Sequence, residues 1–215
     1  MKNIIYKELK LFINPIAYFM LLLSALLVIP SYPAIVGVSY SLLSISICFN
    51  IARANNDNVF TAMLPIPRND IVKGKHFSIS FIEVLQILTA VPFAVVSLFV
   101  TNKNGNIVGL DANLTYFGIT FICYGVFNLV FMPWYFKTGY KAGIPMIVGV
   151  IAYCIVYVAA EFLIGFTNLK FYLDGINVAY VGYRIIVLIS GILFYIVTLI
   201  ISNKISKKNF ERVTL

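Results

Sequence analysis

Six long apolar runs organise the chain, and shorter polar or turn-forming stretches separate them. About 20 mostly apolar residues are needed to cross roughly 30 Å of hydrocarbon, so each run is predicted to be a membrane-spanning helix. A Pro-Ser-Tyr-Pro turn joins the first two runs, which are short, and predicts a hairpin there. The expected spans are residues 16–29, 34–52, 77–100, 114–136, 142–165 and 178–202.

The segment ahead of the first run, residues 1–15, has an amphipathic pattern. Ile5, Leu9 and Phe12 recur at helical spacing on one face, while lysines and a glutamate occupy much of the rest. We expect an interfacial helix whose lysines face anionic lipid headgroups. The alternative is a helix that simply extends the first span.

The polar stretch from Arg53 to His76 lies between the second and third runs and carries clear structural signals. Asn and Asp residues at 55–57 can cap a short helix, and prolines at 65 and 67 stop it. A second Asn-Asp pair can cap the helix that continues into the third span. We expect a short helix over residues 57–64 that acts as a docking element beside the membrane.

The composition supports the membrane class. Of the 215 residues, 61% are hydrophobic, whereas soluble domains contain about 45–50%. We therefore predict an all-α polytopic membrane protein with residues 1–215 in a single transmembrane domain. The six expected spans leave no length for a separate soluble catalytic domain.

The net charge of +8 reflects where Lys and Arg lie around the spans, not a site for nucleic acid. If both ends of the chain lie on one side, that side holds all but three of the 16 Lys and Arg residues, the exceptions being Lys103, Lys170 and Arg184. Loops rich in Lys and Arg remain in the cytoplasm. We therefore expect both termini to be cytoplasmic.

The sequence lacks the motifs of an enzyme. Gly74-Lys75 is followed by His76 and has no upstream glycine at the spacing of a phosphate-binding loop. The spans carry no Ser-His pair, no zinc-binding histidine spacing and no paired glutamates. We expect no catalytic residue, metal site or cofactor on this chain.

Three charged residues lie within apolar runs, where an ionised group is costly. Glu83, in the third span, is expected to face the helix bundle or a partner protein, with Gln86 beside it. Glu161 and Arg184 lie near the outer ends of the fifth and sixth spans and are positioned to pair with each other. The alternatives are structural neutralisation or snorkelling to an interface for all three charges, or an ion-coupled carrier that uses Glu83.

The residues that connect the short helix to the third span carry a recognisable motif. The segment MLPIPRNDIVKGKH, residues 63–76, resembles the LPvsRxxIvxxKy signature of ABC-2 type transporter permeases, and the likeness is to short bacterial members with six spans. Pro67 replaces a commoner Ser, and His76 replaces a Tyr. The matching residues are Leu64, Pro65, Arg68, Ile71, Val72 and Lys75.

This resemblance implies the permease subunit of an ATP-binding-cassette exporter in a bacterial plasma membrane. ATP and Mg would be bound by a separate ATP-binding subunit. Two copies of the permease, or this chain and a sister permease, would form the pathway. The short helix would be the coupling helix that seats on the ATP-binding subunit. The implied contact residues are Asp57, Phe60, Met63, Leu64, Pro65, Arg68, Lys73 and Lys75.

The loops expected on the outer side are short, which argues against capture of a bulky hydrophilic substrate and favours export. The expected cargo is an amphipathic peptide or a hydrophobic small molecule. The competing hypothesis is a non-transporting membrane protein, such as an immunity or scaffold subunit that binds a peptide or another membrane protein.

Overall fold

A computed structural model of the chain describes residues 2–101, 106, 108–139, 141–174 and 178–213. The prediction of an all-α membrane protein is confirmed, because the structure is 85% helical and the described residues include no strand. Five of the described helices are long and apolar enough to cross a membrane, and a bent pair at the N-terminus raises the number to six if it counts as one span. The structure therefore agrees with six spans when the bent pair is counted as one span.

The five long helices correspond to the second to sixth predicted spans. They are α3 (Ala34–Ala54), α5 (Arg68–Thr101), α6 (Leu114–Lys137), α7 (Gly143–Gly165) and α9 (Val181–Glu211). α5 begins well before residue 77 and α9 continues well past residue 202, since an apolar run marks the hydrocarbon and not the end of the helical hydrogen bonding. The shorter elements are α1 (Lys2–Lys7), the π-helix η1 (Glu8–Phe12), α2 (Pro15–Leu21), the 3-10 helix η2 (Leu22–Val28), α4 (Asp57–Met63), α8 (Leu169–Leu173) and the 3-10 helix η3 (Val178–Tyr180).

The first predicted span is formed by α2 and η2, which contain only seven residues each. At about 1.5 Å per residue in an α-helix and about 2.0 Å in a 3-10 helix, they reach about 25 Å. This is close to the roughly 30 Å of a bilayer core, so the 3-10 geometry compensates for the short run. A bend of 74° separates Pro15–Val28 from Asn3–Phe12, so the N-terminal helix is not a straight extension of the first span.

The N-terminal helix buries a charged residue together with apolar ones. Ile4, Glu8 and Phe12 are buried, whereas Ile5 and Leu9 are only half-buried. η1 is a π-helix, which has more residues per turn than an α-helix, so positions four apart align on one side. Of the three residues on the predicted apolar face, Phe12 is therefore buried in the protein, and placement of that face at the membrane interface stays a prediction.

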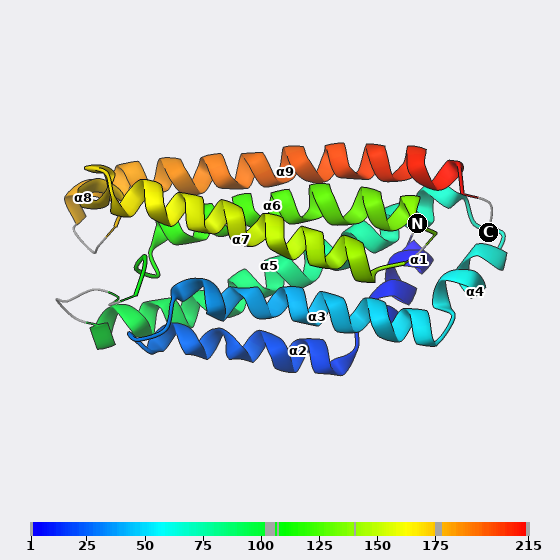
Figure 1. The fold of residues 1–215 in the computed structure, drawn as a ribbon. Helices are drawn as coiled ribbons and strands as arrows, with labels where there is room; N and C mark the ends of the chain where they lie inside the picture. Colours follow the sequence, from blue (N-terminus) through cyan, green and yellow to red (C-terminus); the bar gives the residue numbers. More distant parts are fainter. Residues whose placement is uncertain (1, 102–105, 107, 140, 175–177, 214–215) are drawn as a thin grey trace.

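α5 runs obliquely between two groups of helices (Figure 1). α2, η2 and α3 pack together on one side, and α6, α7 and α9 pack together on the other. Near its start α5 contacts α9, where His76 Nε2 lies 3.2 Å from Ser206 Oγ. Farther along, Gln86 Nε2 donates to Ser24 Oγ of η2 at 2.6 Å and to the Gly37 carbonyl oxygen of α3 at 3.0 Å. α5 thus joins the two groups of helices.

Aromatic side chains connect the N-terminal helices to α6. Phe49 of α3 lies edge-on to both Phe12 and Phe131, with ring centroids 5.0 Å apart in each pair. Tyr135 lies edge-on to the same ring at 4.6 Å. Such edge-to-face contacts add to the free energy of apolar burial. They join η1, α3 and α6 in one core.

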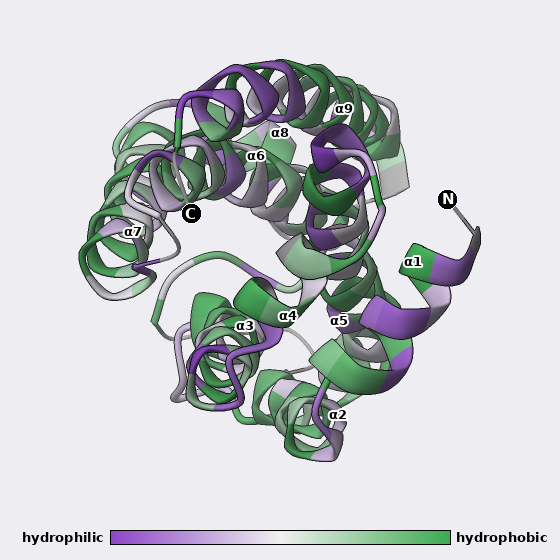
Figure 2. Cartoon of the chain, turned by 90° about the vertical axis from the view of Figure 1, so that its right-hand side faces the viewer, coloured by the Kyte–Doolittle hydropathy of each residue, from purple (hydrophilic) through white to green (hydrophobic). Residues whose placement is uncertain are grey.

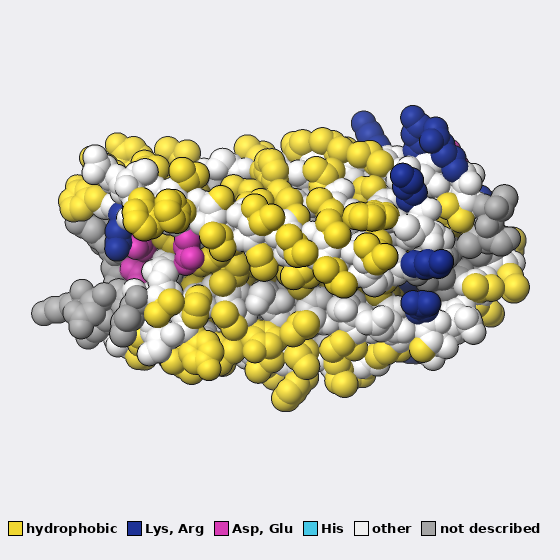
Figure 3. Space-filling view, in the orientation of Figure 1, with side chains coloured by type: hydrophobic (Ala, Val, Ile, Leu, Met, Phe, Trp, Pro, Cys, Tyr) yellow, Lys and Arg dark blue, Asp and Glu magenta, His cyan; other side chains and the backbone are white. Residues whose placement is uncertain are grey.

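Both described ends of the chain lie at the same end of the molecule as α1 and α4 (Figure 1). In the space-filling view of Figure 3, most Lys and Arg side chains gather at this end and apolar side chains cover the middle, while acidic side chains and a basic one beside them lie near the opposite end. The basic residues are therefore segregated along the molecule as the sequence indicates. Placement of the basic end in the cytoplasm stays a prediction.

α6 and α9 approach each other closely at two glycines, Gly118 and Gly191. A Cβ added to Gly191 would overlap the carbonyl oxygen of Gly118, and a Cβ added to Gly118 would lie 2.6 Å from the Val187 carbonyl oxygen. Small residues allow the backbones of membrane helices to approach this closely. Because the neighbouring atoms are backbone, they cannot move aside as a flexible side chain can.

Gly191→Ala is expected to lower the thermal unfolding temperature of the detergent-solubilised protein, because its methyl group must push α9 away from α6. The expected cost is about 1–3 kcal/mol, as for overpacked cores. Gly182→Ala is the matched control in the same helix, because a Cβ there meets no atom within 4 Å. Equal unfolding temperatures for the two variants would show that α6 and α9 do not pack this closely.

Candidate functional site

α4 is a short helix whose limits follow from the polar stretch. It begins after Asn56, which takes a left-handed conformation (φ 51°) that Asn tolerates better than most residues. It ends where Leu64 turns to extended backbone, as expected of a residue that precedes a proline. The predicted helix over residues 57–64 is confirmed to within one residue, although no side-chain hydrogen bond caps its start.

Three of the described side chains of α4 are apolar and exposed, although α4 lies at the charged end of the molecule. Val59 is 48% exposed, Phe60 is 60% exposed and Met63 is 78% exposed. Residues three and four apart are neighbours on a helix, so these three side chains share one face, which we call the α4 apolar face. Large apolar side chains exposed together beside polar residues mark a surface for another molecule.

Behind α4, four charged side chains form a ring at the end of the molecule that faces the viewer in Figure 2. Lys75 Nζ of α5 lies 2.8 Å from Glu8 Oε2 and 3.0 Å from Asp57 Oδ2. Lys7 Nζ lies 3.1 Å from Glu8 Oε1, also contacts Asp57 Oδ1, and donates to Thr61 Oγ1 at 2.6 Å. We call Lys7, Glu8, Asp57 and Lys75 the charge cluster. Cation and anion alternate around it, and its formal charges cancel.

The charge cluster is largely removed from water. The side chains of Glu8 and Lys75 are fully buried, and those of Lys7 and Asp57 are 17% and 16% exposed. Lys75 Nζ also lies 3.8 Å from the centroid of the Phe12 ring, which favours the cation. A buried charge is tolerated when its partners are equally fixed, and removal of one partner is strongly destabilising. The cluster therefore holds α1, η1, α4 and α5 in one arrangement.

Gly74 allows the N-terminal helix to reach the charge cluster. A Cβ added at this position would lie 2.7 Å from Ile4 Cγ2 and 3.3 Å from Glu8 Cγ. The first of these distances is shorter than real Cβ contacts, so a larger residue would separate the N-terminal helix from α5. The close approach brings Glu8 within reach of Lys75.

Asp57 is the member of the charge cluster at the base of α4. Burial raises the pKa of its carboxyl group, but the charges of Lys75 and Lys7 and their hydrogen bonds lower the pKa by more. The net pKa of Asp57 lies below the ordinary value of 3.8. Asp57 is therefore ionised at neutral pH, and α4 remains tied to both lysines.

The other predicted contact residues at the base of α4 have mixed surroundings. Leu64 is half-buried, and Pro65 is exposed. Arg68 is exposed and donates to the carbonyl oxygens of Phe210 and Val213 at 3.4 and 3.2 Å. Arg68 therefore connects the start of α5 to the last turn of α9 and to the residues that follow it.

Lys75 does not belong among the predicted contact residues. Because its side chain is fully buried in the charge cluster, it has no surface to offer a partner or a lipid headgroup. Asp57 likewise directs its carboxylate to the two lysines of the cluster. Lys73 is accessible, with a side chain that is 40% exposed and pairs with Asp70 at 3.3 Å.

Glu83 faces the bundle, one of the two placements that the sequence allowed. Its side chain is fully buried, and Asn128 Nδ2 donates to both carboxylate oxygens at 3.0 and 2.8 Å. The Tyr195 hydroxyl donates to Glu83 Oε2 at 2.6 Å. Gln86 bonds to η2 and α3 and not to Glu83, because it points to the opposite group of helices. These contacts support the structural alternative, in which Glu83 links α5 to α6 and α9.

The prediction that Glu161 and Arg184 pair with each other is wrong, because each contacts other described residues. Glu161 Oε1 accepts from the Leu110 amide at 3.4 Å and from the Tyr157 hydroxyl at 3.1 Å. Arg184 instead donates to the Asp174 carbonyl oxygen at 3.4 Å. The two side chains lie near the same end of the bundle but are held by different segments.

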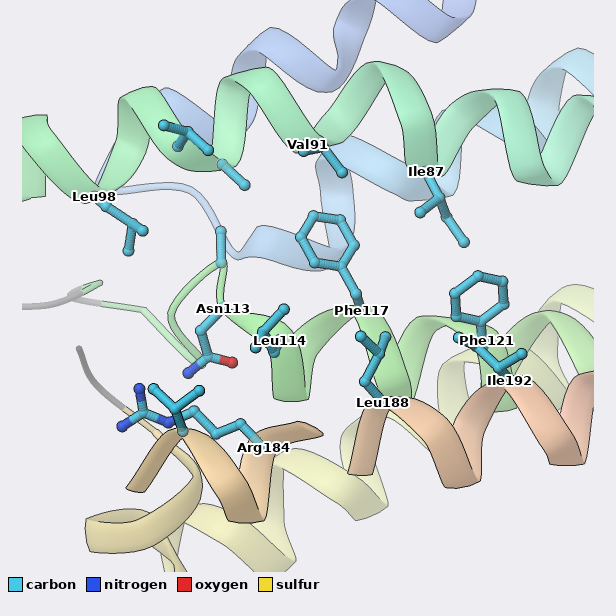
Figure 4. A pocket seen from close by; sticks show the side chains of 14 residues that line it. Ile87, Val91, Leu98, Asn113, Leu114, Phe117, Phe121, Arg184, Leu188 and Ile192 are labelled. Carbon is cyan, nitrogen blue, oxygen red and sulfur yellow. The ribbon is translucent and has the colours of Figure 1, made fainter. Parts of the chain in front are cut away.

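A groove of about 460 Å³ lies between α5 on one side and α6 and α9 on the other (Figure 4). It occupies the part of the bundle toward the C-terminal end of α5, away from α4. Apolar side chains form almost all of its wall, and Asn113 and Arg184 are its polar residues. Other residues that line it include Ile87, Val91, Leu98, Phe117, Leu188 and Ile192.

The sequence did not reveal that Lys7 and Glu8 belong to the site. Both were placed on the polar face of an interfacial helix, where lipid headgroups and water would solvate them. The sequence offered one signal for the burial of Glu8. It lies four residues from Ile4 and four from Phe12, so it shares a helix face with two apolar residues, and all three are buried. Its lysine partner lies far away in the sequence and shares no periodic pattern with it.

A family model described as an ABC-2 family transporter protein matches residues 3–210 of the chain. The match includes the N-terminal helix, the charge cluster, α4 and all five long helices to within one residue of the end of α9. Searches of curated proteins and of solved structures returned no match.

Lys75→Met is expected to destabilise the protein by about 3–5 kcal/mol, because it leaves two carboxylates with a single lysine in a largely buried site. Lys73→Met is the matched control two residues earlier and should change stability by about 0–1 kcal/mol, as for an exposed pair. Thermal unfolding in detergent and proteolysis between α3 and α5 measure the two effects. Equal stability of the two variants would contradict the burial of the charge cluster.

The stability difference between the wild type and Asp57→Asn is expected to shrink as the pH falls below about 4. The folded-state pKa of Asp57 lies below its unfolded value of about 3.9. Its ionised carboxylate therefore stabilises the fold fully above that value, and this contribution is lost as the pH falls through the folded-state pKa. Unfolding temperatures of both proteins between about pH 7 and pH 3 test the sign, and a difference that grows on acidification would reverse the assignment.

Proposed function

Because this chain belongs to the ABC-2 transporter family, we propose that it is the permease subunit of an ATP-binding-cassette exporter and that α4 is its coupling helix. The observation that carries this proposal is the α4 apolar face. It exposes three large apolar side chains at the basic end of the molecule, while the opposite side of α4 is fixed by the charge cluster. A surface that must transmit a push has to be both accessible and rigidly attached.

The charge cluster supplies that attachment. Asp57 connects α4 to Lys75 of α5 and to Lys7 of the N-terminal helix. A displacement of α4 by a partner therefore moves α5 and α1 together, because separating them leaves a buried charge without its partner. The partner in this proposal is a separate ATP-binding subunit that holds ATP and Mg, closes when ATP is bound and reopens after hydrolysis. The catalytic work then belongs to that subunit, and this chain is not an enzyme.

The proposed assembly contains two permeases, either two copies of this chain or this chain and a sister permease. It lies in a bacterial plasma membrane, with the basic end and both termini in the cytoplasm. Segregation of Lys and Arg to the end that carries α4 supports this orientation (Figure 3). Export of an amphipathic peptide or a hydrophobic small molecule suits a bundle with an apolar belt and short connections at its far end.

Two other functions make different predictions. An immunity or scaffold subunit would bind a peptide or a membrane protein without stimulating ATP hydrolysis. An ion-coupled carrier would move its cargo without nucleotide and would depend on Glu83. The bonds from Asn128 and Tyr195 to both Glu83 oxygens favour a structural role for that residue.

The double variant Phe60→Ala, Met63→Ala is expected to reduce co-purification with the ATP-binding partner subunit by about tenfold or more. Two large anchors at the centre of an interface account for this effect. The stimulation of ATP hydrolysis in vesicles should fall in parallel. The matched control is Phe171→Ala, Phe166→Ala, because these side chains are similarly exposed, at 64% and 78%, at the opposite end of the bundle.

If the α4 variant binds and stimulates like the wild type while the control does too, α4 is not the coupling helix. If both double variants weaken the association equally, the loss reflects general instability and the assignment of α4 also fails. Transport that proceeds without any nucleotide would end the exporter proposal.

A further inference from the structure

The groove between α5, α6 and α9 has the length of one leaflet of a membrane. Along α5 its wall runs from Ile87 to Leu98, which is about 16 Å at about 1.5 Å per residue. Half of a bilayer core measures about 15 Å. The groove therefore matches the depth of a single acyl chain that enters from one membrane surface.

The wall of the groove is suited to a hydrocarbon chain. Phe117 projects from α6 toward α5 and faces Val91 across the groove (Figure 4). Leu188 and Ile192 of α9 continue the same apolar surface toward the middle of the bundle. Val91 is 43% exposed, so the α5 side of the groove is open to the lipid around the protein. An acyl chain can therefore enter sideways from the membrane.

Arg184 lies at the end of this groove nearest the membrane surface, beside Asn113 (Figure 4). Its side chain is only 4% exposed, and its Nε has no hydrogen-bond partner among the described residues. Its contact with the Asp174 carbonyl oxygen is long, at 3.4 Å. The ion pairs in the described part of the chain leave Arg184 without a carboxylate. A buried guanidinium with an unused donor is suited to an acceptor that also carries negative charge.

We propose that this groove binds an anionic phospholipid, with one acyl chain along the apolar wall and the phosphate group against Arg184. A guanidinium group binds phosphate through parallel charge-assisted hydrogen bonds, which a bare hydrocarbon cannot provide. An anionic phospholipid also leaves its negative charge free to balance Arg184, whereas the choline group of a zwitterionic lipid already balances its phosphate. The apolar wall lies deeper in the membrane and Arg184 lies nearer its surface, which is where a phospholipid has its acyl chain and its headgroup. The site does not depend on ATP coupling, because it uses only residues of α5, α6 and α9 and the turn before α6.

The test places a fluorescent reporter inside the groove. Phe117→Trp is introduced together with Trp134→Phe, which removes the single natural tryptophan. The protein is reconstituted without an ATP-binding subunit into phosphatidylcholine vesicles. These contain an equal small fraction of either brominated phosphatidylglycerol or brominated phosphatidylcholine. Bromine quenches tryptophan on contact, so quenching reports which lipid occupies the groove.

Brominated phosphatidylglycerol is expected to quench the reporter at about one-tenth of the lipid fraction that brominated phosphatidylcholine requires, because its net negative charge balances Arg184 whereas the choline cation of phosphatidylcholine opposes it. Arg184→Gln should abolish this preference. Lys170→Gln should retain it, because Lys170 is an exposed cation at the same end but lies outside the groove. The natural Trp134, near the opposite end of α6, should show no preference in the protein without these substitutions.

Equal quenching by the two lipids would overturn the proposal and identify ordinary boundary lipid. Absence of quenching by either lipid would also overturn it, and would indicate that a second copy of the chain or another protein covers the groove. If Phe117→Trp disturbs folding, thermal unfolding of the otherwise unchanged protein replaces it. Added phosphatidylglycerol should then raise the unfolding temperature of the wild type and of Lys170→Gln but not of Arg184→Gln. A rise of the same size in all three would equally refute the site.

Discussion

A lysine side chain that is fully buried at the end of a helix bundle must be surrounded by carboxylates, and Lys75 imposes this condition on the structure. Glu8 reaches it from the N-terminal helix and Asp57 reaches it from α4, so two elements far apart in sequence are fixed against α5. Lys7 balances the second negative charge. The orientation of α4, and with it the outward direction of its apolar face, follows from the placement of this one amino group.

The motif that follows α4 acts mainly inside the protein. Its first proline ends α4, its arginine binds the carbonyl oxygens at the end of α9, and its isoleucine and valine are buried. Its glycine admits the N-terminal helix, and its second lysine completes the charge cluster. A short segment thus connects α4 and the start of α5 with α9 and with the N-terminal helix. In order, these residues are Pro65, Arg68, Ile71, Val72, Gly74 and Lys75.

α5 is the element shared by both ends of the molecule. At the basic end it carries Lys75, in the middle Glu83 binds α6 and α9, and one turn later Gln86 binds η2 and α3. Beyond these contacts it forms the open side of the groove that ends at Arg184. In the proposed mechanism, a movement of α4 would pass along this helix and past two polar contacts to the groove. This geometry connects the proposed coupling surface with the proposed lipid site.

The sequence by itself determined the class of protein, the positions of the apolar runs, the segregation of basic residues and the short helix that begins at Asp57. These properties depend on composition, on spacing within one helix and on local backbone preferences, all of which are read along the chain. Only the tertiary structure decided that Lys75 is buried, that Glu8 pairs with it, and that Glu161 and Arg184 do not meet. Periodicity shows which residues share a face of a helix, but the partner of a buried charge comes from whichever distant segment packs against that face.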